Sequence, residues 1–155
     1  MVLPVPLKIG DKAPAFTLKD QLGAPVKLSS FKGRKVLVFF YPKADTGGCT
    51  AQACGLRDIA GDIGDAVILG ISPDQPEKLA KFDTKYSLAF TLLSDPEHQV
   101  AEAWDAWGEK SLYGRKYMGV IRSAFLIDGK GRIAEAWYKI SPKDTPKKLL
   151  AALAA

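Results

Sequence analysis

Cysteine and histidine are scarce in this chain of 155 residues, which contains two cysteines and one histidine. Two cysteines cannot form a disulfide scaffold, so the stability of the fold must come from a hydrophobic core. Together with a single histidine they are also too few for a tetrahedral zinc site, unless carboxylates complete it. The composition therefore disfavours both disulfide-rich scaffolds and zinc-stabilised domains.

Long hydrophobic runs are absent as well. No apolar stretch approaches the roughly 20 residues that span a bilayer, and VLVFF and AVILGI have the length of a strand. The first residues, MVLPVPLKIGDKAPAF, lack a charged n-region, and Pro4 and Pro6 interrupt their apolar stretch. We therefore expect no signal peptide, no membrane association and a cytoplasmic location.

The chain carries an excess of positive charge, with 22 Lys and Arg against 17 Asp and Glu. These cations are scattered along the sequence, often beside an acidic residue, and form only short groups such as Lys147-Lys148. A scattered excess favours a solvated basic surface over a nucleic-acid interface, which would concentrate cations on one patch. We expect no nucleic-acid partner.

No internal repeat or linker-like segment interrupts the chain, which predicts one domain over residues 1–155. The segment AFTLKDQLGAPVKLSSF alternates apolar and polar residues around a Gly-Ala-Pro turn, which predicts an N-terminal β-hairpin. The run KVLVFFYP has the character of a central strand that is covered on both faces. The further elements that we expect are helices over 49–63, 76–87, 96–107 and 145–155, and strands over 66–74, 91–95, 119–128 and 132–140.

Asp95 and Thr145 are the expected N-terminal caps of the last two helices. The alternation of strands and helices predicts an α/β fold with a central β-sheet flanked by helices. Since the last two strands are joined by the short turn Gly129-Lys130-Gly131, they should pair antiparallel and make the sheet mixed.

The chemistry of the sequence centres on Cys49, which follows a buried strand and the pair Gly47-Gly48. If a helix begins near Gly48, the thiol lies in its first turn, where free N–H groups and the helix dipole favour the thiolate. Such a setting can lower a cysteine pKa from ~8.5 into the range of ~3.5–7.5. The glycines let backbone N–H groups approach a bound oxygen, and Thr46 adds a hydroxyl, so the segment suits polarisation of an O–O bond.

The second cysteine, Cys54, lies five positions further on. In an unbroken helix the Cα atoms of such residues are roughly 8–9 Å apart, whereas a disulfide needs less than ~7 Å. Either the two cysteines never bond and are small buried hydrophobic residues, or the helix start unwinds to let them bond. A permanent staple is disfavoured, because closing so short a loop stabilises by only ~2 kcal/mol.

The sequence resembles the peroxiredoxin family over roughly residues 10 to 140. Pro42, Thr46 and Cys49 match its Pro-x-x-x-Thr-x-x-Cys signature. The longer stretches YPKADTGGCTAQACGLRD and GVIRSAFLID resemble the bacterioferritin comigratory protein, or PrxQ, subfamily. This resemblance implies a thioredoxin-like fold and a peroxidase that reduces hydrogen peroxide and organic hydroperoxides in antioxidant defence.

The resemblance also implies the role of each site residue. Cys49 would be the peroxidatic cysteine, Thr46 would hydrogen-bond the peroxide, and Pro42 would shield the pocket from water. Arg122 would stabilise the thiolate and orient the substrate, and Cys54 would resolve the sulfenic acid of Cys49 as an intramolecular disulfide. Thioredoxin or a similar dithiol protein would reduce that disulfide. No metal, flavin or nucleotide cofactor would be needed, and a monomer would suffice.

Two positions depart from the subfamily pattern, and the sequence disfavours two functions other than a peroxidase. Gly47 replaces the usual proline, which predicts a loop that opens more readily, and Gln52 replaces a common glutamate, from which we expect a modest effect. A thioredoxin-like disulfide oxidoreductase is disfavoured because that chemistry uses C-x-x-C, whereas four residues separate these cysteines. A thioredoxin-fold binding or chaperone-like module is disfavoured because it has no use for Thr46, Cys49 and Arg122 together.

Overall fold

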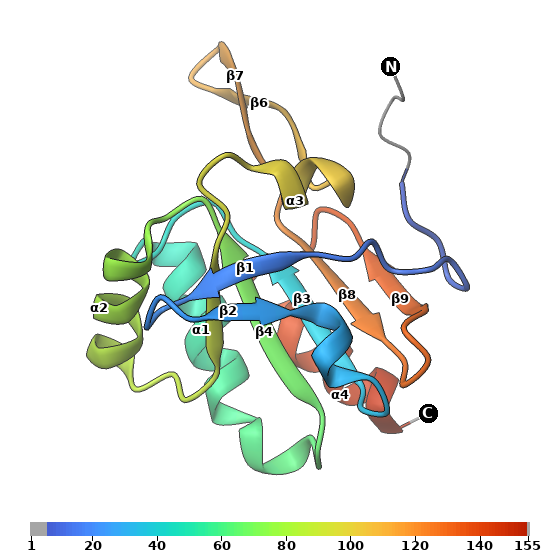
Figure 1. Ribbon diagram of the computed structural model, residues 1–155. Helices are drawn as coiled ribbons and strands as arrows, with labels where there is room; N and C mark the ends of the chain where they lie inside the picture. Colours follow the sequence, from blue (N-terminus) through green and yellow to red (C-terminus); the bar gives the residue numbers. More distant parts are fainter. Residues whose placement is uncertain (1–5, 155) are drawn as a thin grey trace.

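The computed structural model describes residues 6–154, which form a seven-stranded sheet, a separate two-stranded hairpin and the helices around them (Figure 1). The strands are β1 Thr17–Asp20, β2 Pro25–Lys27, β3 Val36–Phe40, β4 Val67–Ser72, β5 Thr91–Ser94, β6 Trp107–Leu112, β7 Arg115–Val120, β8 Ser123–Ile127 and β9 Ile133–Trp137. The helices are α1 Gly47–Asp58, α2 Pro76–Tyr86, α3 Gln99–Ala103 and α4 Asp144–Ala154, with short 3₁₀ helices at Leu28–Phe31 and Ala60–Asp62.

The large sheet has the strand order β2-β1-β5-β4-β3-β8-β9. Strands β3, β4 and β5 are parallel, whereas β1–β2, β1–β5, β3–β8 and β8–β9 pair antiparallel. The predicted mixed sheet, its N-terminal hairpin β1–β2 and its final antiparallel pair β8–β9 are therefore confirmed. Pro25 lies in the edge strand β2, where the missing N–H of proline leaves no ladder bond unmade.

Strand β3 lies inside the sheet, between β4 and β8, and all five of its side chains are buried, alternately on the two faces. Val36, Val38 and Phe40 pack with residues of α3 and of the first 3₁₀ helix. Leu37 and Phe39 pack on the opposite face with residues of α1, α2 and α4. A run of apolar residues without polar alternation is what such a doubly covered strand requires.

The predicted helix over 96–107 is mostly wrong, because α3 contains only Gln99–Ala103. Positive φ angles at His98 and Asp105, of 49° and 55°, bound the helix on either side. The Asp95 carboxylate accepts hydrogen bonds from the backbone N–H groups of Val100 and Ala101, at 3.3 and 3.0 Å. The N-cap position of α3 is His98 and not Asp95 as expected, although the Asp95 carboxylate does accept hydrogen bonds from the first turn.

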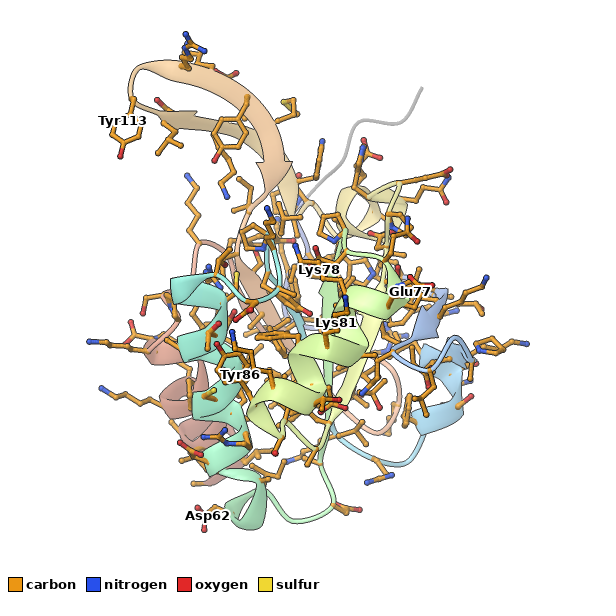
Figure 2. All side chains as sticks on the ribbon, turned by 90° about the vertical axis from the view of Figure 1, so that its left-hand side faces the viewer. Asp62, Glu77, Lys78, Lys81, Tyr86 and Tyr113 are labelled. Atoms are coloured by element: carbon orange, nitrogen blue, oxygen red, sulfur yellow. The ribbon has the colours of Figure 1, made fainter. Side chains whose placement is uncertain are left out.

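The hairpin β6–β7 was not predicted, and it corrects the strand expected over 119–128. Strand β7 ends at Val120 and β8 begins at Ser123, so that Ile121 and Arg122 lie between two different sheets. Tyr113 and Gly114 both have positive φ, 51° and 78°, which suits the twist of a tight hairpin turn. The hairpin projects from the body of the protein, above α3 in Figure 1, with Tyr113 at its tip in Figure 2.

Two smaller corrections concern helix ends. The helix expected over 49–63 begins earlier, at Gly47, and its α-helical part ends at Asp58. Thr145 is not an N-cap, because it lies inside the first turn of α4 and its hydroxyl donates to the Ser141 carbonyl at 2.9 Å. Among residues 6–154, no helix combines the length and the apolar character that crossing a bilayer requires.

Candidate active site

Cys49 lies in the first turn of α1, at the end of the segment that follows the central strand β3. Thr46 precedes the helix in an extended conformation, and the Thr50 N–H donates to the Thr46 carbonyl at 2.8 Å, which closes the first turn. The Cys49 side chain is buried, with 1% of the residue exposed. As the sequence predicted, the thiol is therefore placed at the positive end of a helix dipole.

Arg122 reaches this thiol from the segment between β7 and β8. Because Phe40 pairs with Ser123 across the sheet, Arg122 lies beside the end of β3, where the chain turns towards Cys49. Its Nη2 donates to the Cys49 sulfur at 3.3 Å. A side-chain carbon on Gly48 would lie 3.1 Å from the same Nη2 and 3.4 Å from Pro142, so the absence of a side chain on Gly48 lets the guanidinium approach. The structure thus brings together three of the predicted site residues, Gly48, Cys49 and Arg122.

Gln52, from which we expected little, holds the guanidinium in place. It is fully buried, its Oε1 accepts from Arg122 Nη1 at 2.7 Å, and its Nε2 donates to the Thr145 hydroxyl at 2.9 Å. The amide therefore connects the arginine to the first turn of α4. Since the amide is neutral, it fixes Arg122 without cancelling its positive charge.

The stability of the protein should depend on this buried amide. We expect Gln52→Leu to lower the free energy of unfolding by about 1–3 kcal/mol, because Arg122 loses a buried acceptor while the side-chain volume hardly changes. Urea unfolding followed by circular dichroism measures the difference. Gln99→Leu, at an exposed glutamine of α3, is the matched control and should change the free energy little. Equal stability of both variants would show that the bridge contributes nothing.

Thr46 and Pro42 flank the thiol without a hydrogen bond to it. Thr46 is exposed, and its hydroxyl donates to the Lys43 carbonyl at 2.8 Å, which leaves its oxygen able to accept a further hydrogen bond. Pro42 is half-buried directly after the buried Tyr41. The contacts that the resemblance implies for these two residues, with a peroxide and with water, remain predictions.

Sequence reasoning missed two carboxylates that fix the loop before α1. Asp74 accepts from the Ala44 N–H at 2.7 Å. Asp45, in a left-handed conformation with φ of 60°, accepts from the Tyr86 hydroxyl at 2.7 Å and from Lys85 at 3.0 Å. These hydrogen bonds lower the pKa of Asp45 and tie the loop to α2, on which Figure 2 labels Tyr86. The sequence did contain a signal for this loop. Asp45 precedes Thr-Gly-Gly, and aspartate is one of the few residues that tolerate a left-handed backbone conformation.

Cys54 lies on the same unbroken helix as Cys49, is half-buried, and is a free thiol like Cys49. In regular helical geometry the Cα atoms of these residues are roughly 8–9 Å apart, beyond the ~7 Å limit of a disulfide. A bond between them therefore requires α1 to open. Within residues 6–154, no three His, Cys, Asp or Glu side chains gather as the ligands of a metal would.

A known protein family and a curated protein are similar in sequence to this chain. Residues 9–136 match the model of the AhpC/TSA family. The chain is 55% identical, over 90% of its length and 91% of the relative, to a protein of Haemophilus influenzae named putative peroxiredoxin bcp.

Two solved structures are also similar to this chain. The peroxidoxin BcpB of Mycobacterium tuberculosis superposes with a TM-score of 0.84 at 36% identity, covering 96% of this chain and 97% of that one. The bacterioferritin comigratory protein of Xanthomonas campestris, studied for its alkyl peroxide reduction activity, superposes with a TM-score of 0.84 at 31% identity, covering 90% of each chain. The thioredoxin-like fold that the resemblance implied is thereby confirmed.

Proposed function

The chain belongs to the AhpC/TSA family as a peroxiredoxin of the Bcp/PrxQ type, and on this basis we propose that Cys49 reduces peroxides and Cys54 resolves the product. A peroxiredoxin is a thiol-dependent peroxidase, so the protein is an enzyme. The observation that best supports the proposed roles is the contact of 3.3 Å between Arg122 Nη2 and the Cys49 sulfur. A fixed positive charge on a buried sulfur favours its thiolate, which is the nucleophilic form.

In the first step the thiolate of Cys49 attacks the terminal oxygen of the hydroperoxide. A sulfur–oxygen bond forms, the O–O bond breaks, and the remaining oxygen leaves as water or an alcohol after taking up a proton. Three kinds of group would hold the two peroxide oxygens in line: the guanidinium of Arg122, the backbone N–H groups near Gly48 and the Thr46 hydroxyl. Cys49 is left as a sulfenic acid.

In the second step the thiol of Cys54 attacks the sulfur of that sulfenic acid. A disulfide forms and the hydroxyl leaves as water, so Cys49 and Cys54 together have supplied two electrons to the peroxide. The step requires the start of α1 to unwind, since the intact helix holds the cysteines too far apart. The loop before α1 would open at the contacts of Asp45 with α2.

In the third step thioredoxin or a similar dithiol protein reduces the disulfide by thiol–disulfide exchange. Because both cysteines lie on one helix, one chain of one domain can complete the cycle, and we propose a monomer in the reducing cytoplasm. The substrates would be hydrogen peroxide and organic hydroperoxides. The alkyl peroxide activity studied in the Xanthomonas campestris relative supports the second class.

Gly47→Pro tests the proposed unwinding step. Residue 47 is the first of α1, and no atom lies within 4 Å of a side-chain carbon built there, so proline should fit the folded helix. By restricting the unwound loop, proline should favour the closed helix by ~0.4–1 kcal/mol and slow disulfide formation roughly two- to fivefold. Stopped-flow fluorescence after one equivalent of peroxide measures the rate. A variant that forms the disulfide as fast as the parent would contradict the unwinding role of Gly47.

A coupled assay distinguishes this function from its rivals. Peroxide is added to the protein with thioredoxin, its reductase and NADPH, and NADPH oxidation is followed. We expect continuous turnover that requires all components. A disulfide oxidoreductase would reduce insulin disulfides without peroxide, and a binding or chaperone-like module would show no turnover; either result would contradict the proposal.

A further inference from the structure

Lys110 is a cation that the steps above do not use. It belongs to β6 of the hairpin that projects from the body of the protein in Figure 1. Most side chains of this hairpin are exposed, yet Lys110 is half-buried. Its Nζ donates to the carbonyl of Val120 at 2.9 Å, across the hairpin. Lys116, on β7 of the same hairpin, has 78% of its side chain exposed. Lys110 is therefore held against its own hairpin, at the buried Val120, and does not extend into solvent.

The anchor of Lys110 lies next to the thiol pocket. Val120 precedes Arg122 by two residues, and Arg122 contacts the Cys49 sulfur. Burial lowers the pKa of Lys110, the charge of Arg122 lowers it further, and an anionic Cys49 raises it. Arg122 thus contacts the sulfur directly, and Lys110 is anchored at a residue that lies two positions before Arg122 in the chain.

No carboxylate compensates these two cations within residues 6–154. Arg122 donates to the neutral amide of Gln52, and neither Arg122 nor Lys110 takes part in an ion pair of the described chain. Tyr41 is buried in the same hydrophobic cluster as Cys49, but burial raises its pKa far above the usual range and keeps it neutral. Asp74, the remaining charged group near Tyr41, is paired with Lys78 at 3.4 Å.

The hydrogen bond to Val120 holds the Lys110 ammonium beside the segment that carries Arg122, and Arg122 contacts the Cys49 sulfur. Partial burial disfavours the charged form of Lys110 and lowers its pKa, so a nearby anion would stabilise the ammonium. A thiolate at Cys49 is the anion that both cations can stabilise.

We propose that Lys110 is a positioning residue which, together with Arg122, holds Cys49 as the thiolate that attacks peroxide. This role rests on the proposed peroxidase function. It differs from that of Arg122, since Lys110 acts through the electrostatic potential at the sulfur and not through a direct contact.

The test uses the full chain with Cys54→Ser, so that Cys49 is the only thiol. Alkylation by neutral iodoacetamide is followed by intact mass from about pH 4 to about pH 9, which covers the range of activated cysteines. In Lys110→Met we expect the midpoint of the pH profile to rise by roughly 0.5–1 unit, with alkylation about three- to tenfold slower below the midpoint. Lys110→Arg, which retains the charge, should restore the parent profile.

Lys116→Met, on the same hairpin, is the matched control and should leave the profile unchanged. An unchanged midpoint in Lys110→Met, an equal shift in Lys116→Met, or no rescue by Lys110→Arg would each overturn the role of Lys110. The peroxidase proposal is tested separately, by peroxide consumed in the first turnover of the same single-cysteine parent. A parent that alkylates as a thiolate but consumes no peroxide would contradict the proposed function, whatever Lys110 does.

Discussion

Replacing Cys49 by serine should abolish peroxide consumption, leaving only the rate of the assay without protein. A serine hydroxyl is not ionised at neutral pH, so the pocket retains Arg122 but loses its nucleophile. The fold should be kept, because serine is close to cysteine in volume. The measurement is peroxide remaining against time, with thioredoxin and its reductase present.

The control for this variant is Cys54→Ser, which keeps the nucleophile. Thermal unfolding of the Cys49→Ser chain should show that it is folded, so that loss of activity cannot be attributed to loss of structure. Peroxide consumption by a folded Cys49→Ser protein would contradict the assignment of the attacking sulfur.

Replacing Cys54 by serine should produce a different result: one equivalent of peroxide is consumed, and then the reaction stops. Cys49 can still form the sulfenic acid, but no thiol of the chain can resolve it, and thioredoxin has no disulfide to reduce. Titration of the protein with increasing peroxide, followed by assay of the residual peroxide, gives the number of equivalents.

Addition of a small thiol should restore turnover in the Cys54→Ser variant, because an external thiol can attack the sulfenic acid directly. The same thiol should not rescue Cys49→Ser. Loss of the first equivalent in Cys54→Ser would mean that the roles of the two cysteines are reversed.

The central sheet and the position of the thiol could be predicted because each depends on a local pattern. The run from Val36 to Phe40 contains no polar residue, which only a strand covered on both faces accommodates. The Gly-Gly pair before Cys49 marks a helix start irrespective of the rest of the fold. Both predictions therefore needed no knowledge of distant contacts.

The hairpin β6–β7 could not be predicted in this way. Its side chains are mostly exposed, so no buried face imposes an apolar alternation on the sequence. Its turn depends on Tyr113 in a left-handed conformation, which a tyrosine rarely adopts. Only two residues separate the end of β7 from the start of β8. The sequence therefore predicts one strand over 119–128, where the structure has parts of two.

The bridge of Gln52 escaped prediction for a different reason. It joins residues 52, 122 and 145, which only the tertiary structure brings together. A signal was present, since Gln52 follows Cys49 by three positions and so shares its helix face, next to the buried Ala53. A polar side chain on the buried face of a helix indicates a partner from another element.

The most direct test of the account is the intact mass and thiol count of the protein before and after one equivalent of hydrogen peroxide. We predict two free thiols before the addition and none after it, with a mass lower by two hydrogen atoms, as an intramolecular disulfide requires. Two thiols that remain titratable, or a doubled mass from a bond between two chains, would contradict a cycle in which Cys49 attacks and Cys54 resolves.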